Sequence, residues 1–355
     1  MPTIRSFHST PALALLATLA LLIHHARAQE ATRPGAGGMI GIDTGMAAGR
    51  ACANCPVNNV AAGSRARMQE REALGGDLAT VFTLEPGVRN DSGRAGEGRQ
   101  TYVGLDSRLG ALTLGRQTMP AYLGFTPAEL ADPFRGSTAD YSGQRYDNTV
   151  QYLSPRLRGL SASAIYSYGE APYSNWYRRA YGGTLGYTNG LFQLSVAHQR
   201  KRNVVEATGT APAADLSARS SLVAANLRVG AATAYAAYGS TQGDSGVPWD
   251  SANPYGALAL STPSTDSRDV LMGLSMPYGA ATLMASFIRK DDRNLANRDA
   301  SQVAVGMSYS MSRRTDLYAA YAKIKNHNGA AYAVGRVGEP GRGDSALNVG
   351  LRHAF

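Results

Sequence analysis

The sequence has little of what most enzymes and helical membrane proteins need. Beyond residue 28 it has no run of 18 consecutive apolar residues, the length from which a transmembrane helix is recognised. Histidine occurs six times, three of them within the first 28 residues, and no H-E-x-x-H motif is present. Hydrolases and metalloenzymes need histidine beside a nucleophile or a second metal ligand. We therefore expect no catalytic residue, no metal site and no cofactor.

The first 28 residues have the pattern of a secretory signal peptide. Arg5 precedes an apolar stretch at residues 11–23, and residues 26–28 read Ala-Arg-Ala, the A-x-A pattern of a cleavage site. We expect residues 1–28 to be removed and residues 29–355 to form a single domain. The formal net charge of +9 is compatible with nucleic-acid binding, but export makes nucleic acid an unexpected partner.

Cysteine is nearly absent, because only Cys52 and Cys55 occur, in the order Cys-Ala-Asn-Cys. A single C-x-x-C motif is compatible with redox catalysis, half of a zinc site or a small disulfide. No second ligand pair follows it. In an oxidising compartment a local disulfide in a surface loop is favoured.

What the sequence does have is alternation between apolar and small or polar residues. Forty glycines and 19 tyrosines accompany segments of about ten residues, separated by Gly, Asn, Asp, Ser and Pro. Sixteen strands are expected, at residues 38–48, 64–72, 78–87, 100–107, 111–117, 145–153, 160–168, 179–188, 192–201, 220–229, 231–240, 269–277, 281–289, 302–310, 316–325 and 346–355. Since a bilayer cannot satisfy open backbone groups, these strands predict an all-β, closed antiparallel transmembrane barrel.

The ends of the strands support this fold. Short joins at 106–110, 188–191 and 277–280 alternate with long ones at 203–219, 242–268 and 326–344. The last strand alternates strictly and ends on Phe355, which resembles the signal that the outer-membrane barrel-assembly machinery recognises.

Several motifs, in order along the chain, resemble the general Gram-negative porins. Residues 64–65 (Ser-Arg), 74–78 (Leu-Gly-Gly-Asp-Leu) and 82–85 (Phe-Thr-Leu-Glu) look like their second and third strands. Residues 99–105 (Arg-Gln-Thr-Tyr-Val-Gly-Leu) and 112–117 (Leu-Thr-Leu-Gly-Arg-Gln) are similar to the fourth and fifth. Residues 147–155 (Asp-Asn-Thr-Val-Gln-Tyr-Leu-Ser-Pro) and 350–355 (Gly-Leu-Arg-His-Ala-Phe) resemble the betaproteobacterial, anion-preferring branch.

The resemblance implies a homotrimer of 16-stranded barrels, each with a third loop folded into its lumen. Here that loop corresponds to residues 118–144. Its acids would face an arginine wall, and family wall positions correspond to Arg65, Arg99 and Arg145. The acids available in the loop are Glu129, Asp132 and Asp140, although the usual Pro-Glu-Phe-Gly-Gly-Asp pattern is missing.

Alternation gives a separate expectation for each wall residue. Arg67 shares a face with Arg65 and is added to the wall, and Arg145 is expected to face inward. Arg99 lies on the opposite face of its strand from Tyr102. Because Tyr102 is expected to point outward, Arg99 is expected to point inward.

Three further cations are placed by the same alternation. Arg116 matches a family Gly-Arg pair, yet it falls beside Leu112 and Leu114, so its assignment to the wall stays open. Lys323 and Lys325 are expected to point inward.

Together these features imply a water-filled channel for passive diffusion of small hydrophilic solutes, with a preference for anions. The expected location is the Gram-negative outer membrane, and the expected partners are its lipids and lipopolysaccharide. Three alternatives were weighed: a solute-specific porin, an adhesin or receptor barrel suggested by the Arg-Gly-Asp triplet at 342–344, and an outer-membrane hydrolase. His198 and His353 have outward parity, which disfavours the hydrolase.

Overall fold

The computed structural model describes a chain made of β-strands. It describes residues 35–49, 52–57, 65–88, 95–118, 145–169, 179–202, 204–205, 214–215, 217–243, 264–330 and 345–354. The strands are β1(Gly35–Gly49), β2(Cys52–Val57), β3(Arg65–Gly75), β4(Leu78–Val88), β5(Ala95–Ser107), β6(Gly110–Thr118), β7(Arg145–Leu153), β8(Leu160–Ser167), β9(Ala180–Thr188), β10(Phe192–Lys201), β11(Val204–Val205), β12(Ala214–Asp215), β13(Ala218–Val229), β14(Ala232–Gly243), β15(Asp266–Tyr278), β16(Ala281–Asp292), β17(Ala300–Ser310), β18(Thr315–Asn326) and β19(Ser345–Ala354).

Sixteen of these strands form a ring of antiparallel pairs. Neighbours along the chain pair from β3 to β10, β10 pairs with β13, and the pairing continues to β19. β1 then pairs with both β19 and β3, which closes the ring. Each strand therefore has a hydrogen-bonded neighbour on both sides, as a bilayer requires. The predicted 16-stranded fold is confirmed.

The two faces of the strands differ in the way the alternation predicted. On β17 the apolar side chains of Val303, Val305, Met307 and Tyr309 are exposed on the outside, whereas Gln302 and Ala304 on the other face are buried. Similar outward, apolar positions recur on β8 to β10 and β13 to β19, which gives the barrel an apolar outer band.

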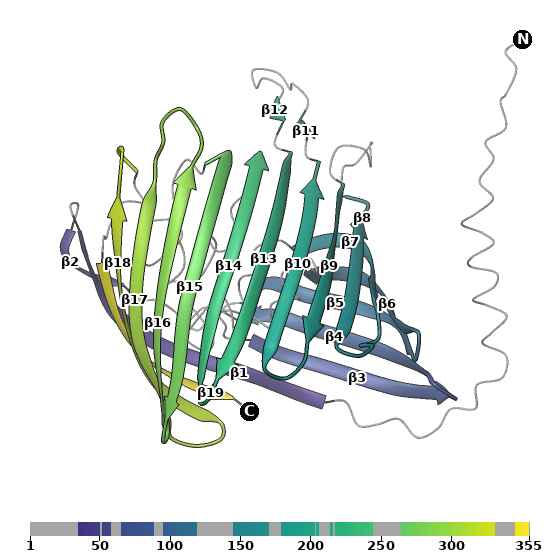
Figure 1. Ribbon diagram of the computed structural model, residues 1–355. Coiled ribbons are helices and arrows are strands. Elements are labelled where there is room, and N and C mark those ends of the chain that lie inside the picture. Colours follow the sequence, from purple (N-terminus) through teal and green to yellow (C-terminus); the bar gives the residue numbers. More distant parts are fainter. Residues whose placement is uncertain are drawn as a thin grey trace, which may run out of the picture.

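The connections at the two ends of the barrel have different lengths. One end, called the turn end here, has short joins such as residues 76–77, 108–109 and 279–280. The other, the loop end, carries the long connections, and the β11–β12 hairpin rises from it (Figure 1). The C-terminal strand β19 runs towards the turn end (Figure 1). The predicted alternation of short and long connections is confirmed at these joins.

Three short strands were not predicted. β11 and β12 pair only with each other, within a connection expected to be a loop. β2 pairs with the loop-end half of β1, so Cys52 and Cys55 lie in a strand and not in a loop. No helix among the described residues is long and apolar enough to span a membrane.

Candidate functional site

Strand β3 carries a ladder of basic residues on the inner face of the barrel. Its register pairs Arg65 with Gly87, Gln69 with Thr83 and Arg71 with Val81 of β4. Paired residues share a face, and residues two apart on a strand lie about 7 Å apart. Arg65, Arg67 and Arg71 therefore occupy positions at different depths along one face. This register places Arg67 on the same face as the buried Glu85 of β4, whereas the position of the Arg65 side chain stays a prediction.

Each described arginine of the ladder lies beside a carboxylate of the same wall. Arg67 Nε is 3.7 Å from Glu85 Oε2 on β4, and Arg71 Nε is 3.2 Å from Asp106 Oδ2 on β5. Gln100 Nε2 also donates a hydrogen bond to Glu85 at 3.5 Å. The acids expected from the sequence lay only in the third loop, so these two carboxylates were not predicted. Alternation along β4 and β5 would have placed them inward.

The two members of each pair differ in exposure. The Arg67 side chain is 38% exposed and that of Glu85 only 4%; the values for Arg71 and Asp106 are 58% and 34%. A solute in the lumen therefore meets the guanidinium groups more than the carboxylates.

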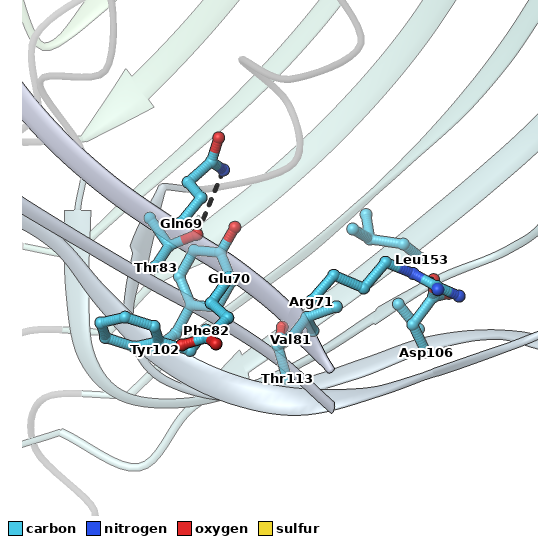
Figure 2. Close-up of a pocket in the computed structure, with 11 residues that line it drawn as sticks. Gln69, Glu70, Arg71, Val81, Phe82, Thr83, Tyr102, Asp106, Thr113 and Leu153 are labelled. Carbon is cyan, nitrogen blue, oxygen red and sulfur yellow. Dashed lines mark hydrogen bonds and ion pairs between the residues drawn. The ribbon is translucent and has the colours of Figure 1, made fainter. Parts of the chain in front are cut away.

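A cavity of about 660 Å³ opens against this wall. Among the residues that line it are Gln69, Arg71, Thr83, Tyr102, Asp106 and Thr113, drawn in Figure 2. The Gln69 amide is hydrogen-bonded to the Thr83 hydroxyl at 3.3 Å, and the Arg71 side chain extends towards Asp106 (Figure 2). The lining combines these polar and charged side chains with apolar ones, among them Val81, Phe82 and Leu153.

Tyr102 faces this cavity, and the outward orientation expected from the sequence is wrong. Its register partner on β4 is Thr83, which lies on the inner face, and its partner on β6 is Gly115. The backbone of Gly115 has φ 138°, and a Cβ there would lie 2.9 Å from Tyr102 Cα. A glycine therefore lets β5 and β6 approach closely beside the tyrosine.

The remaining wall predictions are affected by irregularities in the strands. Gln100 occupies the inward position opposite Glu85, and the register shifts between there and Gly96, so Arg99 lies next to an irregular segment. On β7, Gly115 pairs with Thr149 but Gln117 pairs with Tyr146, a bulge at which Asn148 has φ 52°. One residue of β6, Arg116, thus opposes two of β7, Asp147 and Asn148, and the alternation reverses.

As a result, Arg145 pairs with Thr118, on the face opposite to Gln117. Gln117 lies inward, since its amide is hydrogen-bonded to Thr149 and Thr113. The bulge therefore takes Arg145 out of the simple alternation from which its inward position was expected, and its place on the wall stays a prediction.

Arg116 lies on the outward face, as its alternation with Leu112 and Leu114 indicated. Its Nη1 is 2.6 Å from both oxygens of Asp147, and its Nε donates to the Gly98 carbonyl at 2.8 Å. The bulge brings Asp147 to the same face. Arg116 thus joins β5 to β7 instead of facing the lumen.

Lys323 and Lys325 also lie outward, contrary to the sequence expectation. Both are exposed and share a face with Leu317 and Tyr321, whereas Tyr318 on the other face is buried. Alternation misled here because β18 carries apolar or aromatic residues on both faces, such as Leu317 on the outside and Tyr318 on the inside.

Several predicted residues lie outside the part of the chain that the structure describes. These are Glu129, Asp132, Asp140, the Arg-Gly-Asp triplet at 342–344 and Phe355. The side chains of Arg65, Arg99, Cys52 and Cys55 lie outside it as well, so their assignments stay predictions.

The histidines form no catalytic arrangement in the described residues. His198 Nδ1 is 2.8 Å from Ser221 Oγ, and His353 Nδ1 is 2.9 Å from Thr315 Oγ1, both at exposed, outward positions. Among the described residues, no carboxylate is hydrogen-bonded to either imidazole to orient it. Within the described ranges, no group of three His, Cys, Asp or Glu residues is placed to hold a metal ion.

Comparison with known proteins decides the family. The family model of the Gram-negative porins matches residues 45–329. The chain belongs to the Gram-negative porin family. An outer membrane porin protein of Bordetella pertussis is 27% identical over 339 residues, covering 84% of each chain. Outer membrane porin protein 32 of Delftia acidovorans is 24% identical over 316 residues, covering 82% of this chain and 84% of that one.

A solved structure shows the same porin fold. The anion-selective porin from Comamonas acidovorans superimposes with a TM-score of 0.71 at 21% identity, over 92% of this chain and all of the other. The family resemblance inferred from the motifs is confirmed. The basic ladder of β3 lies on the inner wall of a porin barrel.

Proposed function

We propose that the chain forms a water-filled channel through which small hydrophilic solutes diffuse passively, with a preference for anions. One observation carries the preference: the guanidinium groups of Arg67 and Arg71 are more exposed than the carboxylates of Glu85 and Asp106 beside them. A buried carboxylate balances the charge of the protein but is partly hidden from the solute. The net field at the wall is therefore positive.

The ladder acts on an anion along its path and not at one point. Arg65, Arg67 and Arg71 follow one strand, so the positions span about 20 Å of backbone. An anion that leaves one guanidinium group comes within reach of the next, and weak contacts at several depths favour conduction over retention. Salt screens these contacts, since the Debye length is about 10 Å at 0.1 M. This mechanism needs no conformational cycle and no energy source.

The third loop remains part of the proposal. Residues 118–144 would narrow the lumen, and Glu129, Asp132 or Asp140 would face Arg65, Arg67, Arg99 or Arg145 across it. If so, the carboxylates of the loop add a transverse field to that of the wall, which orients dipolar solutes.

Bilayer recording of the refolded mature protein tests the channel. We expect stepwise conductance increases, arriving in threes, and a reversal potential in a salt gradient that indicates anion selectivity. Uptake of neutral sugars into vesicles should fall steadily with sugar size. A folded barrel that conducts no ions would contradict the channel, and a single saturable sugar would favour a solute-specific porin.

A homotrimer is also proposed, supported by two acids on the outer face of β3. Glu70 pairs with Phe82 and Glu72 with Thr80, on the same face as the exposed Met68. A charged side chain facing lipid costs free energy that depends on its depth. Contact with another copy of the chain would give these carboxylates a protein environment instead.

Replacing Glu70 and Glu72 together with leucine distinguishes the two environments. If this face packs against another copy, the double variant should dissociate to monomers in milder detergent conditions than the original protein, as read by light scattering. If the face contacts lipid, the variant should instead unfold at higher denaturant concentration with its oligomeric state unchanged, and that result would count against this interface.

The biogenesis of the channel follows the same proposal. Signal peptidase would cleave after Ala28, and the barrel-assembly machinery would recognise β19 and Phe355 before insertion into the outer membrane. A Phe355→Ala variant should then accumulate in the periplasm, while the unmodified protein reaches the outer membrane.

A further inference from the structure

The third loop leaves the barrel wall from a root that is hydrogen-bonded on the inner face. β6 ends at Thr118 and β7 begins at Arg145, and these two residues are register partners. Next to this root, Gln117 Nε2 donates a hydrogen bond to Thr149 Oγ1 at 2.9 Å, and Thr149 Oγ1 donates to the Gly115 carbonyl at 2.6 Å. These bonds hold β6 and β7 together where the loop begins and ends.

The outer face of the same root carries an ion pair, called here the root clamp and formed by Arg116 and Asp147. Arg116 Nη1 is 2.6 Å from both carboxylate oxygens of Asp147, and Arg116 Nε donates to the Gly98 carbonyl at 2.8 Å. Ser167 Oγ of β8 donates to the Asp147 carbonyl at 2.8 Å. The Arg116 and Asp147 side chains are half-buried, at 28% and 33% exposure. The root clamp thus bonds four adjacent strands, β5 to β8, to one another.

The backbone beside the root clamp is irregular in both strands. Gly115 has φ 138° and Asn148 has φ 52°, a region that residues with a side chain rarely adopt. Thr149 lies inward, so regular alternation would also turn Asp147 inward, and the bulge at Asn148 brings it to Arg116 instead. Because the ion pair forms only while the bulge is present, it offsets the strain of the positive φ at Asn148.

Neither charge of the root clamp acts directly on an anion in the lumen. Both groups lie on the outer face, and the channel mechanism uses neither of them. Their opposite charges are only 2.6 Å apart, so the pair contributes little to the field at a distance. An effect of the root clamp on selectivity therefore has to arise through the backbone of β6 and β7.

We propose that the root clamp positions the third loop and thereby sets the anion preference of the channel, an inference that rests on the proposed channel function. Arg116 and Asp147 are positioning residues, since neither touches the solute. Loss of either partner leaves the other charge unpaired and removes the interaction that favours the bulge. Without the bulge the first residues of β7 follow regular alternation, and a shift of one residue exchanges the faces of their side chains. The loop then leaves the wall in a different direction.

Two substitutions of opposite charge test the proposal. Arg116→Gln removes the cation of the root clamp, and Asp147→Asn removes its anion. The matched controls are Arg108→Gln and Asp77→Asn, because these two residues form an exposed ion pair of 3.7 Å between turns at the turn end. The refolded mature proteins are compared by reversal potential in a salt gradient and by single-channel conductance.

We expect both clamp variants to lower the anion-to-cation permeability ratio, each by at least about threefold, because both release the same root. Charges that acted through their own fields would give changes of opposite sign, since one variant loses a positive charge and the other a negative one. The control variants should keep the ratio of the original protein. Changes of opposite sign, unchanged ratios, or an equal loss in the controls would each overturn the proposal.

Substitution of Asn148 tests the bulge while both charges of the root clamp are present, and it gives the answer if a clamp variant fails to fold. Asn148→Val disfavours the positive φ, because a β-branched residue rarely adopts it, whereas Asn148→Gly accommodates it. Asn148→Val should lower the permeability ratio as the clamp variants do, and Asn148→Gly should leave it unchanged. Equal ratios in these two variants would contradict the dependence of selectivity on the bulge.

Proteolysis separates this proposal from the channel proposal. Arg135 belongs to the third loop, and trypsin cleaves after arginine. We expect cleavage after Arg135 in detergent to be at least about threefold faster in both clamp variants than in the original protein and the controls. Faster cleavage together with an original protein that does not conduct would contradict only the channel, whereas unchanged cleavage would contradict the root clamp.

Discussion

The arginines of β3 and the exposed, outward-facing cations of β10, β13, β15, β16 and β18 lie on opposite faces of the barrel wall. On β3 the arginines face the lumen, each described one beside a carboxylate of a neighbouring strand. On β10, β13, β15, β16 and β18 the exposed cations that face outward, such as Arg200, Arg289 and Lys323, lie near the loop end. The strands of both walls alternate in the same way. The difference shows that the face of the strand on which a cation lies decides whether it can act on a solute in the lumen or on the surrounding membrane.

The largest expected effect is on the free energy of unfolding, and it depends on how deep in the apolar outer band a charge is introduced. Val223→Arg introduces a cation near the middle of the outer face of β13, whereas Ser221→Arg introduces it two residues nearer the loop end. We expect Val223→Arg to lower the free energy of unfolding by about 2–4 kcal/mol and Ser221→Arg by about 0–1 kcal/mol. Denaturant titration in lipid vesicles measures both. Equal losses would mean that the two positions do not differ in their membrane environment.

The next largest effect should be that of ionic strength on the anion preference, which the arginines of the inner wall produce. Raising the salt concentration from 0.1 M to 1 M shortens the Debye length from about 10 Å to about 3 Å. The anion preference should then fall by up to about tenfold, because the ladder acts through water. Reversal potentials at constant gradient ratio measure it. A preference that persists at 1 M would indicate direct binding instead of a screened field.

The smallest effect should come from the buried member of an inner pair. Glu85→Gln removes a carboxylate that is only 4% exposed, and the amide can still bond to Gln100. We expect the anion preference to rise by less than about twofold, because the lumen already sees little of this charge. If Glu85→Gln changed the reversal potential as much as Arg67→Gln, the difference in exposure would not be the cause of selectivity.

Much of the barrel could be predicted from the sequence, because each strand must satisfy lipid on one face and water on the other. Val303 to Tyr309 show this alternation without interruption, and the structure follows it. The inner wall was harder to predict. At Asn148 one extra residue reverses the parity of β7, and no residue type marks a bulge unambiguously, although asparagine tolerates its positive φ.

Aromatic and small residues misled the parity argument elsewhere. Tyr102 resembles an outward-facing residue by type, yet its partner Thr83 places it inside. β18 begins with apolar residues on both faces, so Lys323 and Lys325 could not be assigned from that strand alone. In each case the register with the neighbouring strand supplies the information that a single strand lacks.

The measurement that tests the account most directly is the reversal potential of an Arg67→Gln, Arg71→Gln double variant in a salt gradient. A unit charge about 6 Å from an ion in water contributes about 0.7 kcal/mol, with opposite sign for an anion and a cation, so losing the guanidinium group nearest to the ion should lower the anion-to-cation permeability ratio roughly tenfold. Arg313→Gln with Arg314→Gln serves as the control of equal charge and should leave the ratio unchanged. An unchanged ratio in the wall variant, or equal changes in both, would contradict the assignment of selectivity to the arginines of β3.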